Sequence, residues 1–257
     1  MLEAISALKG YGIEASDGRI GTVGDFLFDD RSWRVRWIVV DTGGWLTGRK
    51  VLVHPSAFEV ADYERRRLAV KLTKAQVEAS PDIREDQPVS LQMESELHNY
   101  YGWDPLWVGG YLGEDSGAMA APLSAPPYFG IAADRLRIDV EPTADQGDPH
   151  LQSVGEVTGY RLHASDGEIG HVENFLFDSA TWEIRYLIVD TRNWWPGKHV
   201  LMSPQAVASI DWLDHHLHLD VTRDQVRTSP PWDPLKLMDE SEMKRLHGHY
   251  GWPGSAA

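Results

Sequence analysis

The sequence predicts an all-β fold with short helical appendages, arranged as two small antiparallel β-barrels in tandem. Three observations lead to this prediction. Residues 10–81 recur at residues 159–230 with a constant offset of 149, and 31 of the 72 aligned positions are identical. The apolar residues of each copy alternate in short runs with a period of two, which is typical of β-strands. A helix-capping pattern then follows the runs in each copy.

The duplication indicates which positions geometry or packing requires, because both copies keep the same residue there. Gly18 and Gly167 each follow an aspartate, and such Asp-Gly pairs are typical of turns in which glycine takes a positive φ. Apolar residues kept in both copies are expected to be buried. They are Ile20, Val23, Phe26, Val40 and Leu52 with their partners Ile169, Val172, Phe175, Val189 and Leu201.

The strands of the first copy follow from its apolar runs and turn residues. Residues 33–42, WRVRWIVVDT, are rich in aromatic and β-branched side chains, and the polar turn at residues 29–32 precedes them. Strands are expected at residues 20–28, 33–42, 50–53, 57–63 and 68–72. Five or six such strands bury one face and avoid open edges by curling into a small barrel.

Helices are expected after the strands of each copy. Thr73-x-x-Gln76 and Thr222-x-x-Gln225 fit capping boxes that open short helices, which Pro81 and Pro230 would stop. A second helix then closes each copy, with Gly102 and Gly251 as C-terminal caps inside the shared sequence Tyr-Gly-Trp.

Domain boundaries follow from these elements. We expect a first barrel with its C-terminal helix at residues 1–103 and a second at residues 156–257. The acidic connector at residues 104–155 is rich in glycine, alanine and proline. Each copy has roughly 100 residues, which is enough for one small core.

Composition restricts the function. The chain has no cysteine, which excludes disulfides, thiolate metal sites and a cysteine nucleophile. Its first residues do not resemble a signal peptide and no stretch has the roughly 20 apolar residues of a membrane span, so a cytoplasmic protein without membrane insertion is expected. The net charge is −15 and neither repeat is basic, so we expect no binding to nucleic acid.

The shared motifs resemble the PRC-barrel family, found in the cytoplasmic domain of the photosynthetic reaction centre H subunit and in the C-terminal domain of the ribosome maturation factor RimM. They are A-S-D-G-x-I-G-x-V-x-x-F-L-F-D, W-x-[VI]-R-[WY], V-D-T-x-x-W, G-[RK]-x-V-L and T-x-x-Q-V-x-x-S-P. The resemblance covers residues 10–81 and 159–230 and implies two PRC-type barrels used for docking. It carries no catalytic residues to this chain.

Tryptophans on loops and at helix ends are the candidate partner-binding residues: Trp45, Trp194, Trp195, Trp103 and Trp252. Tryptophan is enriched at interface hot spots, but a large aromatic ring also serves to close one end of a barrel. For the shared Trp45 and Trp194, packing is the favoured interpretation. Trp195 occurs only in the second copy and is the stronger candidate for exposure.

Four shared polar residues are candidates at the barrel rim. Asp41 and Asp190 end the most apolar strand of each copy, with Arg36 and Arg185 as expected charge partners. Because aspartate readily accepts hydrogen bonds from nearby backbone amides, capping of the following loop is favoured over acid-base chemistry.

Histidines form the one cluster with metal-like chemistry. In a strand, His216 and His218 would point to one face and could share an ion. The first copy has Arg67 and Ala69 at these positions, so the fold does not require the pair, and a solvated hairpin is favoured over a metal site. We predict no cofactor and no metal.

The preferred function is a non-catalytic adaptor or scaffold that docks protein partners through its barrel surfaces. A basic partner would complement the acidic chain. The alternatives are a ligand- or metal-responsive binding module and an accessory subunit of an electron-transfer complex. No catalytic constellation is found, so an enzyme is not predicted, and homo-oligomerisation is left open.

Overall fold

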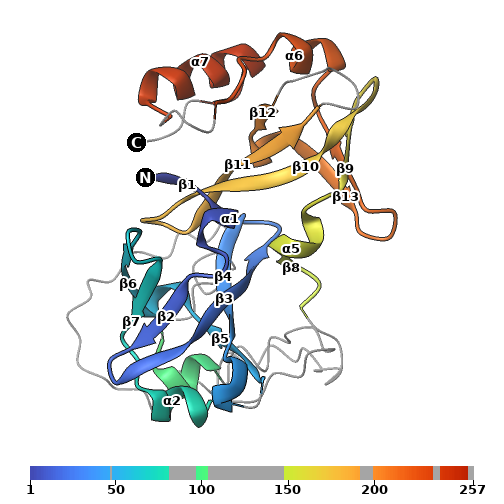
Figure 1. Cartoon of the computed structure of the whole chain (residues 1–257). Helices are drawn as coiled ribbons and strands as arrows, with labels where there is room; N and C mark the ends of the chain where they lie inside the picture. The colour runs from blue at the N-terminus through green and yellow to red at the C-terminus, as the bar shows by residue number, and fades with distance from the viewer. Residues whose placement is uncertain (47, 81–96, 104–147, 192–198, 234–237, 254–257) are drawn as a thin grey trace, which may run out of the picture. The chain divides into compact units, whose positions relative to one another are not determined.

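The computed structural model describes residues 1–46, 48–80, 97–103, 148–191, 199–233 and 238–253. It divides into two compact units: residues 1–85 with 149–257, and residues 86–148. Both repeats therefore belong to one unit, whose course is shown in Figure 1. The predicted boundaries at 103/104 and 155/156 stay a prediction, because most of the connector lies outside the described residues.

Strands dominate the first repeat. Its elements are β1 (Leu2–Ala4), α1 (Ile5–Leu8), β2 (Gly12–Ala15), β3 (Gly18–Asp29), β4 (Arg34–Asp41), η1 (Gly43–Leu46), β5 (Lys50–Val53), η2 (Pro55–Ala57), β6 (Phe58–Asp62), β7 (Arg67–Val70) and α2 (Lys74–Glu78). The aspartate before Gly18 ends a tight turn, and this glycine has a φ of 131°, as the Asp-Gly pattern predicts.

From β8 to β14, the strands of the second repeat lie at a constant offset of 149 from those of the first. The elements of this repeat are β8 (Leu151–Ser153), α5 (Val154–Val157), β9 (Arg161–Ala164), β10 (Gly167–Asp178), β11 (Glu183–Asp190), β12 (His199–Met202), η3 (Pro204–Ala206), β13 (Val207–Asp211), β14 (His216–Leu219), α6 (Arg223–Thr228) and α7 (Glu240–Tyr250). The correspondence starts at Leu2 and Leu151, earlier than the sequence similarity indicates. Residues 151–155, expected in the connector, thus form β8 and the start of α5.

The helices begin and end as their capping residues predict. Thr73 and Thr222 each form a capping box with the glutamine three residues later. Gly251 ends α7 with a φ of 73°, and Gly102 follows the helical residues 97–101 with a φ of 69°. Among the described residues, no helix has the length and apolarity needed to cross a bilayer.

The sheet is mixed, which corrects the prediction of antiparallel strands. β2 pairs in parallel with β7, and β9 pairs in parallel with β14. The other pairings are antiparallel, and fourteen strands of the described residues join into one sheet. Its central order is β13-β14-β9-β10-β11-β4-β3-β2-β7-β6, so the sheet runs through both repeats. The parallel pairs arise because β7 lies beside β2, on the edge that faces away from β3, and β14 lies beside β9, on the edge that faces away from β10.

The paired strands of each repeat do not close into a barrel, which also differs from the prediction. In the first repeat the path of paired strands ends at β5 and β6, and in the second it ends at β12 and β13. The described hydrogen-bonded pairs thus leave each curved half open. The strand-dominated architecture is confirmed, whereas two closed barrels are not.

The first strand of each repeat pairs with the other repeat. β1 pairs with β10, where Leu2 opposes Asp178, and β8 pairs with β3, where Leu151 opposes Asp29. Figure 1 shows both exchanges, with the blue β1 beside β10 and the yellow-green β8 beside β3. The two repeats therefore complete each other's sheet.

Two polar side chains hold the exchanged segments at the same pseudo-symmetric position. Asp25 accepts hydrogen bonds from the Ser153 hydroxyl at 2.5 Å and from the Gly155 amide at 3.1 Å. Asn174, its counterpart in the second repeat, donates to the Ser6 hydroxyl and accepts from the Ser6 amide at 3.3 Å. Each side chain thus satisfies donors at the start of the other repeat's first helix.

The sheets of the two repeats meet at the turns that precede β4 and β11. Trp33 and Trp182 both have a positive φ, 55° and 57°, which is unusual for a bulky residue. This conformation directs the Trp33 carbonyl to the amide of Ile184 at 2.7 Å and the Trp182 carbonyl to the amide of Val35 at 2.9 Å. The unfavourable dihedral angles are therefore coupled to joining the repeats.

The core contains the apolar residues that both copies share. All ten residues predicted from the duplication are buried, with Phe26, Val40, Ile169, Val172, Phe175 and Val189 completely inaccessible to solvent. The cores of the two repeats touch, because the ring centroids of Phe28 and Phe175 lie 6.0 Å apart. Burial thus confirms the ten residues predicted from the duplication. The central strands do not alternate strictly, because four consecutive residues of β4 and five of β11 are buried.

Candidate functional site

Trp45 lies on η1 and is half-buried, with the Lys74 ammonium 5.4 Å from its ring centroid. The Lys74 side chain at the start of α2 thus lies over this ring, and the partner-binding role of Trp45 stays a prediction. Trp194 and Trp195 lie outside the described residues, so their predicted roles stay predictions.

The Tyr-Gly-Trp sequences fold back on their own helices. Trp252 stacks on Tyr250 with ring centroids 4.2 Å apart, and its amide donates to the His247 carbonyl at 3.0 Å. Trp103 repeats this arrangement with Tyr101 at 4.1 Å. Both tryptophans are half-buried by this local packing. The two rings therefore pack against their own helix ends, and their partner-binding role stays a prediction.

The shared aspartates have different surroundings. Asp41 is exposed and accepts a hydrogen bond from the Gly43 amide at 2.9 Å, which confirms that it caps the loop. Asp190 is only 2% exposed, and its carboxylate lies 3.9 Å from Nε2 of His171. The first repeat has Thr22 at the position of His171, so this neighbour of Asp190 is specific to the second repeat.

The expected pairing of these aspartates with arginine is wrong. Arg36 lies 3.4 Å from Asp29, and Arg185 lies 3.3 Å from Glu183. Arg36 and Asp41 are five residues apart on β4, roughly 16 Å at the usual rise of a strand. The rim residues therefore do not form one site.

His216 and His218 do lie on one face of β14, and a third histidine joins them. The ring of His163, on the neighbouring β9, lies 4.7 Å from that of His216 and 5.6 Å from that of His218 between centroids. In the described part of the chain, no group of three or more histidine or acidic side chains has the geometry to hold a metal ion. Sequence reasoning missed His163, because only the parallel pairing of β9 with β14 brings it to the cluster.

Within this cluster, protonation of His163 is disfavoured. Burial lowers the pKa of His163 from 6.5, followed by the charge of His216; His218 and Arg161 act in the same direction and Glu168 opposes them. The first repeat has Glu14 and Arg67 at the positions of His163 and His216, and these two form an ion pair at 2.6 Å. One place in the fold thus carries an ion pair in one repeat and imidazoles in the other.

We expect acid to destabilise the second repeat through this cluster. A histidine whose pKa is lowered in the folded protein binds a proton more readily in the unfolded chain. Its contribution to stability is therefore fully present above pH 6.5, the ordinary pKa of histidine, and is lost as the pH falls below that value. The double variant His163→Glu/His216→Arg introduces the residues of the first repeat. Urea unfolding at pH 7.5 and pH 5.5 should show a smaller acid-induced loss for the double variant. An equal loss in both proteins would contradict the prediction.

The hairpin between β13 and β14 carries an exposed apolar tip. Leu213 is 93% exposed, the largest value among the large apolar residues of the described chain. Asp211 fixes the turn by accepting hydrogen bonds from the amides of Leu213 and Asp214 at 3.1 and 3.0 Å. Sequence reasoning missed this tip. The signal was the difference between the copies, since the first repeat has the charged Glu64 where the second has the apolar Leu213.

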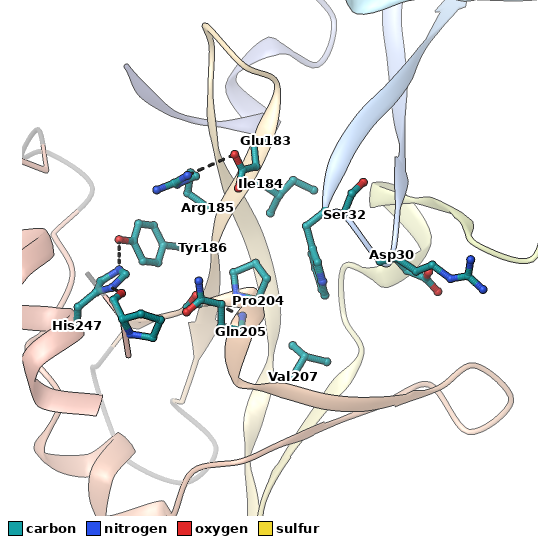
Figure 2. Close-up of a pocket in the computed structure, with 14 residues that line it drawn as sticks. Asp30, Ser32, Glu183, Ile184, Arg185, Tyr186, Pro204, Gln205, Val207 and His247 are labelled. Atoms are coloured by element: carbon teal, nitrogen blue, oxygen red, sulfur yellow. Dashed lines mark hydrogen bonds and ion pairs between the residues drawn. The ribbon is translucent and has the colours of Figure 1, made fainter. Parts of the chain in front are cut away.

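A cavity of about 600 Å³ opens where the repeats meet. The first repeat contributes Asp30, Arg31, Ser32 and Trp33. The second repeat and the chain after it contribute Glu183, Ile184, Arg185, Tyr186, Ser203, Pro204, Gln205, Val207, His247 and Pro253. Figure 2 shows Asp30 and Ser32 on the side of the first repeat and Pro204, Gln205 and Val207 on the side of the second. The cavity therefore depends on the junction.

A buried polar pair forms part of the cavity wall. Nδ1 of His247 lies 2.7 Å from the Pro253 carbonyl, which can only accept, so this nitrogen carries the proton. The Tyr186 hydroxyl then donates to Nε2 of His247 at 2.8 Å, as Figure 2 shows. Burial raises the pKa of Tyr186, so the hydroxyl keeps its proton. The two hydrogen bonds thus fix the orientation of both rings.

These features place residues 2–77 among small, strand-dominated domains. The sequence profile of the PRC-barrel domain matches these residues, and this segment is a PRC-barrel domain. The match begins at β1 and ends in α2, so the exchanged strand is part of the domain. The resemblance stated for the first repeat is thereby confirmed.

The chain is also similar to an uncharacterized protein of Deinococcus radiodurans. The two are 36% identical over 83 residues, which make up 32% of this chain and 29% of that protein. The chain thus matches less than a third of the length of this relative.

Proposed function

We propose that both repeats are PRC-type modules and that the chain is a non-catalytic adaptor that docks a protein partner. The profile match at residues 2–77 supports the first module. Support for the second is the recurrence of the same strands at a constant offset of 149, from β1 and β8 to β7 and β14. The docking role rests on the resemblance to a family of docking domains together with one surface feature.

The exposed tip at Leu213 is the observation that carries the proposal. A leucine that is 93% exposed contributes nothing to the core and leaves its apolar surface in water. The fold does not need an apolar residue there, since the first repeat has the charged Glu64 on the equivalent hairpin. An apolar side chain on a turn fixed by Asp211 is preorganised for insertion into a partner.

The surroundings of Leu213 favour a partner with basic residues around an apolar pocket. Asp211 and Asp214 flank the tip. The backbone hydrogen bond from Asp214 lowers the pKa of Asp211, so its carboxylate stays charged at neutral pH. The net charge of −15 adds long-range attraction for a basic surface, which increases the association rate and makes it sensitive to salt.

Site-specific photocrosslinking in the native cell tests the proposal. A photoreactive phenylalanine analogue replaces Leu213, and in the matched control it replaces Glu64 on the hairpin of the first repeat. We expect one discrete crosslinked protein from position 213 that is absent from position 64. Leu213→Ser should weaken capture of that protein by roughly tenfold or more while changing the free energy of unfolding by no more than about 0.5 kcal/mol. The same crosslinks from both positions, or none from position 213, would exclude this tip as the docking surface.

A further inference from the structure

The offset of 149 relates the cavity at the junction to an equivalent place where the two repeats also meet, and an aromatic side chain fills that second place. At the equivalent place, Phe58 packs against Trp182 with ring centroids 5.9 Å apart. In the cavity, Val207 stands at the position of Phe58 and Trp33 at that of Trp182. The exchange of a phenyl ring for an isopropyl group therefore accounts for open space beside Trp33.

The equivalent place in the other half indicates which group fits the space beside Trp33. Because the repeats share backbone elements and the tryptophan, the place that the Phe58 ring occupies in one half is available in the other. Ile184 and Pro204 extend the apolar wall. Gln205 and the Tyr186–His247 pair supply polar groups. A volume of about 600 Å³ exceeds a single phenyl ring and lies within the range of small-molecule sites.

Arg31 supplies a positive charge for an anionic substituent on such a ring. Asp30 lies 2.9 Å from Nδ1 of His150, and Glu183 lies 3.3 Å from Arg185, so both carboxylates have a basic partner. Arg31 lines the cavity and is exposed, and no hydrogen bond or ion pair of its guanidinium occurs among the described residues. A flexible arginine at the rim can reach a carboxylate held in the cavity.

We propose that this cavity is a binding site for a small aromatic carboxylic acid. Its ring lies beside Trp33 and Val207, in the space that corresponds to the Phe58 ring, and its carboxylate lies at the rim near Arg31. The site contains residues of both repeats, so it exists only while the repeats are joined. It is separate from the hairpin tip and does not depend on the docking role proposed for Leu213.

Two variants taken from the other repeat test the site in the full chain. Val207→Phe introduces the residue of the first repeat and fills the space, while Arg31→Ala introduces the residue that the second repeat has at Ala180. Both residues already occur at these positions of the fold, and thermal unfolding checks that the variants remain folded. Benzoate is the probe, and benzylamine is the cationic control of similar size, each titrated by ligand-observed NMR.

We expect saturable binding of benzoate to the unmodified protein with a Kd on the order of millimolar, as for other fragments of this size. Val207→Phe should weaken binding by tenfold or more. Arg31→Ala should weaken it by roughly two- to fivefold, as for an exposed ion pair. Benzylamine should bind more weakly than benzoate. Absence of saturable benzoate binding, or binding unaffected by Val207→Phe, would overturn the proposal. If Val207→Phe fails to fold, equal benzoate affinity of the Arg31→Ala variant and the unmodified protein would overturn it.

Discussion

Phe26→Ala is expected to lower the free energy of unfolding by about 3–5 kcal/mol. Phe26 lies on β3, is completely inaccessible to solvent and recurs as Phe175. Its removal leaves a cavity that a densely packed interior cannot fully close. Urea denaturation followed by circular dichroism measures the loss. Because a typical domain has only about 5–15 kcal/mol of stability, this one substitution removes a large part of it.

Two further variants make the result interpretable. Phe175→Ala removes the equivalent ring of the second repeat, which also contacts Phe28 across the junction, and should cost at least as much. Glu64→Ala on an exposed hairpin should change stability by no more than about 0.5 kcal/mol. A loss below about 1 kcal/mol for Phe26→Ala would show that the core is less tightly packed than its burial indicates.

Ile5→Ala is expected to lower the free energy of unfolding by about 2–5 kcal/mol and to weaken the second repeat, although the residue belongs to the first. Ile5 is buried on α1, and this helix contacts β10. Amide hydrogen exchange should therefore show faster exchange along β10. The effect crosses the junction because β1 and α1 complete the sheet of the other repeat.

Val154→Ala is the matched variant on α5 and should increase exchange along β3. The expected loss is smaller, about 1–3 kcal/mol, because valine is smaller than isoleucine. Faster exchange confined to the repeat that carries each substitution would contradict the reciprocal exchange. Coupled effects in both directions would mean that the two repeats unfold as one cooperative body.

Such coupling has a consequence for binding. The Leu213 tip and the junction cavity would lie on one cooperative scaffold rather than on two independently moving domains. A rigid scaffold loses less conformational entropy when a partner or ligand binds. The reciprocal hydrogen bonds of Asp25 and Asn174 are therefore expected to support binding without touching a ligand.

Local patterns in the sequence determined the elements of the fold. The alternation that ends at Phe28 gives β3, the Thr73 and Thr222 capping boxes open α2 and α6, and Gly251 ends α7. The duplication also identified ten core residues without a structure, because a residue kept in both copies of a strand faces the same interior. These features depend on neighbours within a few residues, and one sequence is enough to specify them.

How the strands and helices pair across the two repeats follows only from the tertiary structure. β1 and β8 are three residues long and share one identical residue, Leu2 and Leu151, so their exchange has no local signal. The parallel pairing of β9 with β14 brings His163 to His216, and the junction of the repeats places Trp33 and Val207 along one cavity. Each of these depends on residues far apart in the chain, whose pairing is set by total burial and hydrogen bonding rather than by local preference.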